Sequence, residues 1–294
     1  MNLEKSDIKY SSVQNAADEA SFLAQKNYLK FIKLQLTMLF LSTLTSIFVG
    51  YNRGLLFLVL FFMIVNFAIS TIIKLRKSER VWYDGRAVAE SIKTLSWRYM
   101  MKAEPFNLND SEKDDEIRFI EIVDEVLDAR RGLAFQIMDR SDNKDFVTDE
   151  MRTMRRLAHE TRLKIYLEKR VNDQRKWYSK KSYYNRKWES ILFYFSLIFQ
   201  IVAIVYIILM VTFKQLDINL TAIFTSLVTL SVTWHQVKRH YELANAYGIA
   251  AQELMKIYSL GIKATDEQSF SEYVNDSENA ISREHTLWTA RRGQ

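Results

Sequence analysis

Residues able to do covalent or metal chemistry are sparse and scattered in this chain. Cysteine is absent, which excludes disulfides, thiol catalysis and thiolate metal sites. The four histidines, His159, His235, His240 and His285, do not cluster in the sequence. None of the seven glycines is arranged as a phosphate-binding loop. We therefore expect neither an enzyme, nor a cofactor, nor a metal site.

Hydroxyl side chains recur at helical spacing within apolar sequence. Thr221, Thr225 and Thr229 stand four residues apart, and Thr37 and Thr45 belong to a similar patch nearer the N-terminus. Hydroxyl stripes can line a wet pore. They can also let helices pack closely while they bond to their own backbone. The five threonines are candidate pore-lining residues, and helix packing is the alternative.

A second group of residues combines charge with aromatic rings. Arg86 and Glu90 stand four residues apart, and Trp82 stands four residues before Arg86, so a helix would place the three on one face. The pattern is typical of an ion pair with an aromatic ring stacked on the guanidinium. It also fits a contact that transmits a signal between subunits or between repeats. The candidate residues for such coupling are Trp82, Arg86, Glu90, Trp97 and Glu253.

The elements that must position these residues are four long apolar segments, at 34–49, 55–73, 191–213 and 220–237. A membrane-spanning helix needs about 20 mostly apolar residues. The segments form two pairs, each joined by a short loop, and an offset of 163 residues places the first pair on the second. The sequence therefore predicts a duplicated transmembrane hairpin. No charged residue lies within a span, which argues against a proton relay, a voltage sensor or an ion-coupled carrier.

Lysine and arginine predict how these spans are oriented. Basic residues gather before the first and third spans and after the second and fourth. The short loops that join the two spans of each pair contain one basic residue each, Arg53 and Lys214. Basic flanks favour the cytoplasmic side. We expect a multi-pass protein of the inner (cell) membrane with both termini in the cytoplasm. Its partner would be the lipid bilayer and not nucleic acid, because basic collars at an anionic leaflet explain the high isoelectric point.

Long helices are expected to carry the spans into the cytoplasm. Few glycines and a single proline argue for uninterrupted helices. One continuous helix is predicted over residues 55–102, one from residue 149 through the third span, and one from the fourth span to residue 260. Ser111 and Thr148 are predicted to cap the helices that follow them.

Charge is layered along this cytoplasmic part. Acidic residues outnumber basic ones by fourteen to six in residues 105–150, and basic residues outnumber acidic ones by thirteen to three in residues 151–187. We expect the basic residues to face lipid headgroups and the acidic ones to keep the distal helices soluble. A contact between subunits, or a vestibule that attracts cations above a pore, is the alternative.

The predicted fold is all-α: an integral membrane protein with four transmembrane helices, in two tandem hairpins, and a cytoplasmic helical bundle formed by extensions of the spans. Residues 1–147 would form the first two-transmembrane domain with its cytoplasmic helices. Residues 148–294 would form the second, with a long preceding helix and C-terminal amphipathic helices. Because four spans are few for an aqueous pore, we expect a homo-oligomer.

Residues after the first hairpin and near the C-terminus add a more specific pattern. They are residues 282–292 together with Trp82, Tyr83, Arg86, Ala87, Glu90, Lys93, Trp97 and Tyr99. With the short hairpins, they give a chain that resembles two tandem copies of the SLATT domain family, which are two-transmembrane domains of bacteria. The second half departs from the pattern, because it lacks the Trp-Tyr pair and the arginine.

The resemblance implies a pore-forming or membrane-perturbing effector of an antiphage or conflict system. A nucleotide-second-messenger sensor or synthase would then be a partner. The predicted function is therefore an oligomeric membrane channel or pore effector, gated by a cytoplasmic signal. The alternative is a non-conducting membrane-anchored scaffold that presents a cytoplasmic helical interaction module.

Overall fold

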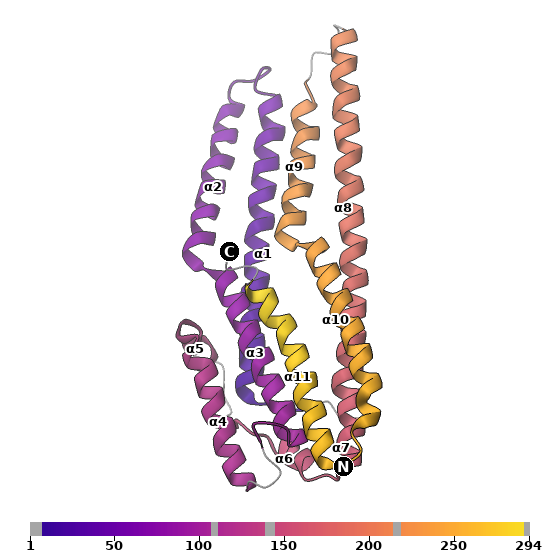
Figure 1. The fold of residues 1–294 in the computed structure, drawn as a ribbon. Coiled ribbons are helices and arrows are strands. Elements are labelled where there is room, and N and C mark those ends of the chain that lie inside the picture. The colour runs from indigo at the N-terminus through magenta and orange to yellow at the C-terminus, as the bar shows by residue number, and fades with distance from the viewer. Residues whose placement is uncertain (1–7, 107–110, 139–144, 214–218, 291–294) are drawn as a thin grey trace. The chain divides into compact units, whose positions relative to one another are not determined.

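The computed structural model describes residues 8–106, 111–138, 145–213 and 219–290, and in these ranges it contains helices, turns and loops but no strand. The predicted all-α fold is therefore confirmed (Figure 1). The α-helices are α1 (Ser12–Ile47), α2 (Leu55–Arg76), α3 (Ser78–Met101), α4 (Glu112–Asp128), α5 (Arg131–Met138), α6 (Asp149–Arg155), α7 (His159–Tyr166), α8 (Asp173–Thr212), α9 (Thr221–Lys238), α10 (His240–Leu260) and α11 (Glu267–Ala290). A π-helical segment, Leu167–Asn172, links α7 to α8, and a 3-10 turn, Gly261–Lys263, follows α10.

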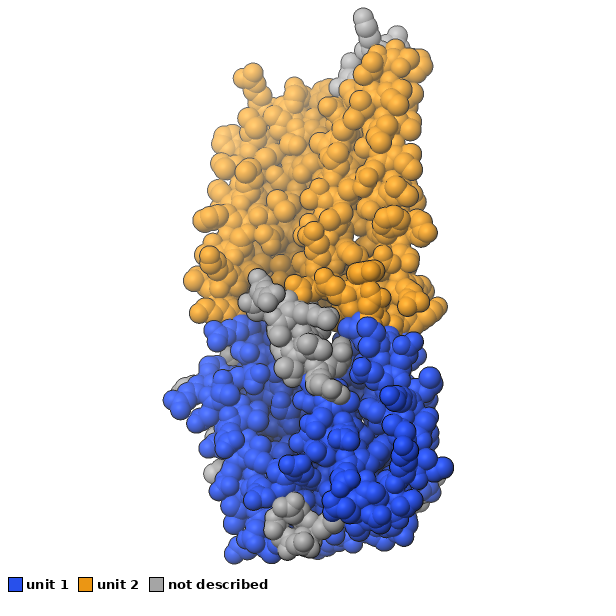
Figure 2. Space-filling model, in the orientation of Figure 1, with its two compact units in different colours: residues 1–25, 79–180, 246–294 blue, residues 26–78, 181–245 orange. Residues whose placement is uncertain are grey.

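The chain divides into two compact units, each built from both halves of the sequence (Figure 2). Unit 1 contains residues 1–25, 79–180 and 246–294, and unit 2 contains residues 26–78 and 181–245. Helices α1, α8 and α10 contribute residues to both units. The predicted domains, 1–147 and 148–294, follow the chain and not these units, so their boundary stays a prediction.

Unit 2 contains the apolar segments that the sequence predicts as spans. In the described chain, two helical stretches, within Leu55–Met101 and His159–Thr212, are long and apolar enough to cross a membrane. Their most apolar windows are only 6% and 11% buried, unlike the core helix of a soluble protein. Thr and Ser dilute the apolar residues of α1 and α9. Two of the four predicted spans therefore meet the criterion, and the four-span topology stays a prediction.

Polar contacts join the two helices of each hairpin in unit 2. The Asn66 side-chain amide donates to the backbone carbonyl of Gln35 at 3.0 Å, and the Gln35 amide donates to the Ser70 hydroxyl at 2.9 Å. In the second hairpin, the Ser231 hydroxyl of α9 donates to the Leu192 carbonyl of α8 at 3.0 Å. Such side chains satisfy one another's hydrogen bonds where water is scarce, and they fix the register of each helix pair.

The continuous helices predicted over residues 55–102 and beyond the fourth apolar segment are wrong. Lys77 separates α2 from α3 with a left-handed φ of 48°. Arg239 separates α9 from α10 with a φ of 49°. Under the 163-residue offset the two breaks agree within one residue, so both hairpins end in the same turn. A left-handed residue other than glycine costs about 1–2 kcal/mol, and neither position carries the glycine or asparagine that usually marks such a turn.

The helix predicted from residue 149 through the third apolar segment is also interrupted. Thr148 caps α6 as predicted, accepting a 3.3 Å hydrogen bond from the Met151 amide. The helix then stops, because Ala158 is extended, with φ −61° and ψ 150°. The helix resumes as α7 and the π-helical segment before α8. The predicted cap at Ser111 is confirmed by a 3.2 Å hydrogen bond from the Asp114 amide.

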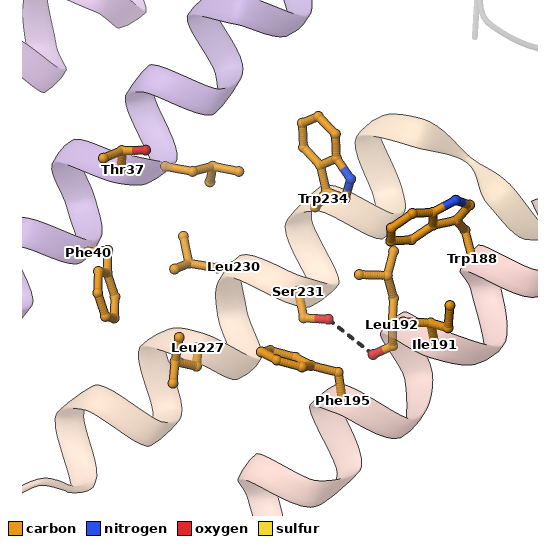
Figure 3. Close-up of a pocket in the computed structure, with 11 residues that line it drawn as sticks. Thr37, Phe40, Trp188, Ile191, Leu192, Phe195, Leu227, Leu230, Ser231 and Trp234 are labelled. Carbon is orange, nitrogen blue, oxygen red and sulfur yellow. Dashed lines mark hydrogen bonds between the residues drawn. The ribbon is translucent and has the colours of Figure 1, made fainter.

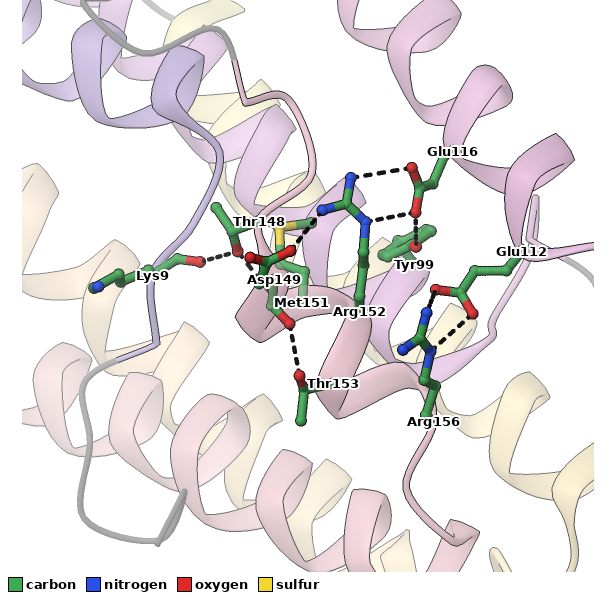
Figure 4. Close-up of polar contacts among 10 residues, drawn as sticks. All are labelled: Lys9, Tyr99, Glu112, Glu116, Thr148, Asp149, Met151, Arg152, Thr153 and Arg156. Atoms are coloured by element: carbon green, nitrogen blue, oxygen red, sulfur yellow. Dashed lines mark hydrogen bonds and ion pairs between the residues drawn. The ribbon is translucent and has the colours of Figure 1, made fainter. Parts of the chain in front are cut away.

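Unit 1 has a dense aromatic and aliphatic core supported by ion pairs. Figure 4 shows one such network, in which the Arg152 guanidinium donates two hydrogen bonds to Glu116, at 2.8 and 3.1 Å, and one to Asp149 at 2.9 Å. The Tyr99 hydroxyl also donates to Glu116, at 3.4 Å. The network joins α3, α4 and α6. It is one of the contacts that hold the acidic helix α4 in the unit.

Three arginines of the basic segment are buried in unit 1, which corrects the expectation that this segment faces lipid headgroups. Arg155, Arg162 and Arg170 are each at most 4% exposed. They pair with Asp115, Glu267 and Glu278, respectively. A buried charge requires a partner and hydrogen bonds. These three cations are therefore part of the packing of unit 1.

Candidate functional site

Four of the five predicted coupling residues lie on α3, which packs very closely against α1 in unit 1. A Cβ added at Gly85 would lie 3.1 Å from the Ala17 carbonyl oxygen and from the Ser21 Cβ, so glycine permits this approach. About one turn away, the Ser21 hydroxyl donates a 2.8 Å hydrogen bond to the Trp82 carbonyl. Together the two contacts fix the rotation of α3 against α1.

Two of the predicted residues, Arg86 and Glu90, line a polar cavity of about 400 Å³ within unit 1. Arg86 Nη2 lies 3.8 Å from Glu90 Oε1, and the two side chains are 28% and 18% exposed. The Arg86 guanidinium also lies over the ring of Trp177, 5.7 Å from its centroid. The cavity walls come from α1, α3, α8 and the π-helical segment. The predicted ion pair is thus part of a site to which four elements contribute.

The other predicted coupling residues have different surroundings. Trp97 is fully buried, its indole nitrogen donates to the Tyr10 hydroxyl at 3.1 Å, and its ring meets Tyr166 edge-on. Trp82 is also buried and stacks on Tyr83 with ring centroids 4.5 Å apart. Glu253, the repeat counterpart of Glu90, is exposed on α10 and does not line the cavity. The structure brings Arg86 and Glu90 together and leaves Trp97 in the core.

The cavity is lined by side chains of both charges. The cavity is lined by four cations and three carboxylates: Arg86, Lys93, Lys169, Arg170, Asp18, Glu90 and Asp173. Burial lowers the pKa of the Lys93 ammonium, and the positive charge of Arg170 lowers it further. Glu90 opposes this shift without cancelling it. Glu278 and Asp18 also oppose it, so burial is the main reason that the charged form of Lys93 is disfavoured.

Arg170 is held rigidly at the same cavity. Its Nε and Nη2 donate to the two carboxylate oxygens of Glu278 at 2.8 and 2.7 Å, and Nη2 also contacts the Thr94 hydroxyl at 3.3 Å. Burial lowers its pKa, but the Glu278 carboxylate outweighs burial, so the pKa is raised and the guanidinium stays charged. Its Nη1 is buried and has no hydrogen-bond partner among the described residues. Glu278 and Thr94 therefore hold the Arg170 guanidinium in place.

Sequence reasoning missed Arg170, Lys169 and Gln14 as site residues. Arg170 and Lys169 lie in the π-helical segment, in a basic stretch that sequence alone assigns to lipid headgroups. Short π-helical segments are frequent at functional sites, but no residue type predicts where they occur. In the sequence, Lys93 is singled out only as one residue of the pattern that resembles the SLATT family. Its place at the cavity depends on the packing of α3 against α1 and α8.

The predicted pore-lining threonines of α9 are on its exposed surface. Thr225 and Thr229 are exposed, and their hydroxyls donate to the backbone carbonyls four residues earlier, at 3.0 Å each. Thr221 begins the helix, and its amide donates to the Asn219 side chain at 3.0 Å. The three threonines therefore form one stripe along α9. Their role as pore-lining residues stays a prediction.

The two candidate threonines of α1 are placed differently. Thr37 lines an apolar groove between α1, α8 and α9 of unit 2, about 480 Å³ in volume, with Leu230 and Ser231 of α9 also in its wall (Figure 3). Thr37 and Thr45 donate to their own helix, to the carbonyls of Lys33 and Leu41. The groove unites Thr37 with α9 but includes none of Thr45, Thr221, Thr225 or Thr229.

Comparison with known families agrees with the tandem architecture. A model of the SMODS and SLOG-associating 2TM effector domain 3 matches residues 12–163, and a model of domain 1 of the same series matches residues 166–288. No curated protein and no solved structure gave a match. Domains of this kind are associated with conflict and antiphage effector systems. The chain therefore belongs to the SMODS and SLOG-associating two-transmembrane effector (SLATT) family, and it carries two of these domains in tandem.

Proposed function

We propose that this chain is an oligomeric membrane channel or pore-forming effector of a bacterial conflict or antiphage system, opened by a cytoplasmic signal. The observation that supports this most is the exposed apolar surface of unit 2. Examples are Phe57 and Phe67 on α2 and Val211 on α8, whose exposures are 80%, 75% and 77%. Large contiguous apolar surfaces are rare in water, whereas the bilayer core accommodates them.

All four apolar helices of unit 2 are proposed to cross the bilayer. The hydrogen bonds from Asn66 to Gln35 and from Ser231 to Leu192 tie the less apolar helices α1 and α9 to α2 and α8. Interhelical bonds of this kind support polar residues in hydrocarbon. Basic residues at the ends of α2 and α9 favour an inner-membrane protein with both termini in the cytoplasm.

A conducting path would require several copies of the chain. The groove between α1, α8 and α9 is lined almost entirely by apolar side chains, so ions would not enter it readily. Thr225 and Thr229 lie instead on the exposed face of α9. In a homo-oligomer, this face would meet the same face of neighbouring copies and surround a hydroxyl-lined path.

The proposed partners follow from the apolar surface of unit 2 and from the family resemblance. They are the lipid bilayer, further copies of the chain, and a nucleotide-second-messenger sensor or synthase that supplies the signal. We propose neither a nucleic-acid partner nor an enzymatic activity. In this scheme unit 1 receives the signal, and the spans respond.

A non-conducting scaffold is the second candidate function, and one observation favours it. The Thr225 and Thr229 hydroxyls are satisfied by carbonyls of their own helix, so they need no water. The stripe could then face lipid or pack against a neighbouring helix. In that case the hairpins would anchor unit 1, which would act by binding a partner.

The test is the membrane potential of bacteria that express the chain, read with a voltage-sensitive dye. A pore depolarises the cells, and Thr229→Lys, which places a charge on the exposed stripe, alters the effect. Thr71→Lys is the matched control, because Thr71 is an exposed threonine of α2 whose hydroxyl likewise bonds to its own helix. An unchanged potential in cells with confirmed membrane expression, or equal effects of both substitutions, would favour the scaffold.

A further inference from the structure

The apolar groove between α1, α8 and α9 of unit 2 is a space that the chain itself does not fill. Its volume is about 480 Å³. The Thr37 hydroxyl in its wall donates to the Lys33 carbonyl at 2.9 Å. The Ser231 hydroxyl donates to the Leu192 carbonyl at 3.0 Å. Most of the remaining wall is hydrocarbon, so the groove suits an apolar occupant.

The groove is too small for a helix. Its α8 wall runs from Trp188 to Phe195. Seven residues of helix span about 10 Å, and a helix of that length with its side chains occupies about 800 Å³. A helix of a second copy would therefore rest on the groove without filling it, whereas a single hydrocarbon chain can enter it.

One end of the groove carries aromatic residues that proteins place at a membrane surface. Trp188 and Trp234 lie at this end, and Phe195 and Leu227 lie farther along the groove (Figure 3). Tyr184 is next to Trp188, with ring centroids 6.3 Å apart. Tryptophan and tyrosine are enriched at the level of lipid headgroups. The tryptophan end, defined by Trp188 and Trp234, therefore marks the headgroup level in a bilayer.

Lysines lie on the groove face of α1 and α9, just beyond the tryptophan end. Lys33 stands four residues before Thr37, which is in the groove wall. Lys238 stands four residues after Trp234, so each lysine is one helical turn from the wall and on the same face. The Lys33 Nζ lies 5.4 Å from the centroid of the Trp234 ring. Both lysines therefore belong to the same end of the groove.

A third lysine, Lys181, follows the same pattern on α8. It stands seven residues, or about two turns, before Trp188, on the same face of the helix. Lys33 and Lys181 are close enough to Lys238 for their positive charges to act on it. The three helices of the groove thus place positive charge at one end of it.

Carboxylates do not balance this charge. The described part of unit 2 contains two acidic residues, Glu189 and Glu242. Glu242 pairs with Arg239 at 3.5 Å. Neither Lys33 nor Lys238 forms an ion pair with a described residue. Even with Glu189 counted against them, the three lysines leave this end of the groove positive.

Charge decides between a lipid and a second copy of the chain as the occupant. Copies inserted in one membrane share an orientation, so another copy would bring its own basic end to the groove, and like charges would repel. An anionic headgroup would be attracted instead. Basic pockets between transmembrane helices are typical sites for such headgroups.

We propose that the groove binds an anionic phospholipid, with one acyl chain between α1, α8 and α9 and the phosphate at Lys33, Lys181 and Lys238. The bound lipid would link α1 of the first hairpin to α8 and α9 of the second. This inference rests on the proposed position of these helices in the bilayer, and it does not require conduction.

Native mass spectrometry of the delipidated full-length chain in detergent tests the site, because it counts the lipids bound to each chain. The probes are phosphatidylglycerol, phosphatidylcholine with the same acyl chains, and glycerol 3-phosphate. We expect one phosphatidylglycerol per chain at low concentration, bound at least about tenfold more tightly than phosphatidylcholine. Glycerol 3-phosphate, which has the phosphate without the chains, should not displace it.

Lys238→Gln tests the headgroup contact. Loss of one cation near an anionic headgroup should weaken phosphatidylglycerol binding about fivefold and leave phosphatidylcholine binding and the melting temperature unchanged. Lys74→Gln is the matched control, because it removes a lysine from the last turn of α2, which does not line the groove. This control should bind phosphatidylglycerol as the wild type does.

Leu230→Trp tests the acyl-chain contact, because Leu230 is in the groove wall and the larger side chain fills the empty space. Binding of both lipids should fall. Leu60→Trp is the matched control, at a leucine that is 53% exposed on α2. It should bind both lipids normally.

Three results would overturn the proposal. They are equal affinities for the two lipids, displacement of phosphatidylglycerol by glycerol 3-phosphate, and an affinity for phosphatidylglycerol that either Lys238→Gln or Leu230→Trp leaves unchanged. A dimer that Leu230→Trp disrupts without changing lipid binding would assign the groove to a second copy. Because ion flux is not measured, failure of this test leaves the channel proposal standing, and a chain that does not conduct can still bind the lipid.

Discussion

Arg170 and Glu278 form a doubly hydrogen-bonded ion pair buried in unit 1, with N–O distances of 2.8 and 2.7 Å and side chains at most 1% exposed. The same guanidinium reaches the Thr94 hydroxyl at 3.3 Å. Thr94 belongs to the first matched domain, whereas Arg170 and Glu278 belong to the second. One arginine therefore links the two tandem domains within a single compact unit.

Removing one partner of this buried ion pair should lower the stability of the protein much more than removing one partner of an exposed pair. Glu278→Leu leaves the Arg170 charge buried without its partner, which should cost about 3–5 kcal/mol. The double variant Arg170→Met with Glu278→Leu should recover part of that loss, because no charge remains buried. Asp128→Asn is the control. It breaks the exposed pair with Arg131 and should cost less than about 1 kcal/mol.

Thermal unfolding of the purified chain in detergent measures these differences. The ranking of melting temperatures should be wild type and Asp128→Asn, then the double variant, then Glu278→Leu. A single variant as stable as the wild type would show that the pair contributes little to unit 1.

Two glycines should respond in opposite ways to alanine. Gly132 lies in α5 with no atom within 4 Å of an added Cβ, so Gly132→Ala should raise stability by about 0.5–1 kcal/mol through helix propensity. At Gly85, the added Cβ would press on the backbone of α1 at 3.1–3.2 Å, so Gly85→Ala should gain less or lose stability. Melting temperatures of the two variants decide this. Equal gains would mean that α1 and α3 are not closely packed.

Single cysteines can establish the topology, because the chain has none of its own. With four spans, an impermeant maleimide added to spheroplasts should label Tyr51→Cys and Asn219→Cys but not Lys256→Cys. All three positions are exposed. If only α2 and α8 cross, Tyr51 and Lys256 lie on the same side and label alike. Lys256→Cys should react once the membrane is permeabilised, which controls for its reactivity.

The proposed conducting path can be tested with the same cysteine-free background. Thr229→Cys should react with a charged methanethiosulfonate reagent and change the ion flux through proteoliposomes, because a pore-facing position is in water. Phe67→Cys, at a residue 75% exposed on α2, should not react, because lipid would surround it. Reaction at both positions, or at neither during measurable flux, would remove α9 from the pore wall.

The sequence predicted the local features well. Apolar periodicity and few glycines indicated an all-helical chain, and side-chain chemistry identified the caps at Ser111 and Thr148. These features depend on residues within a turn or two of one another. The spacing of Arg86 and Glu90 also placed them correctly on one helical face.

The breaks in the long helices could not be predicted in this way. Lys77 and Arg239 adopt left-handed conformations that their residue types do not favour. Hydropathy and spacing therefore suggested continuous helices. Such a conformation persists only when the surrounding packing stabilises it, and that packing involves residues far away in the chain.

The sequence by itself determined the helical class, the two apolar hairpins and the family pattern, because composition and short-range periodicity encode them. The tertiary structure alone decided which basic residues are buried and which of them line the polar cavity. Arg170 meets Glu278 across 108 residues and Thr94 across 76. No local pattern can specify such partners, since burial of a charge depends on which distant carboxylate the fold places beside it.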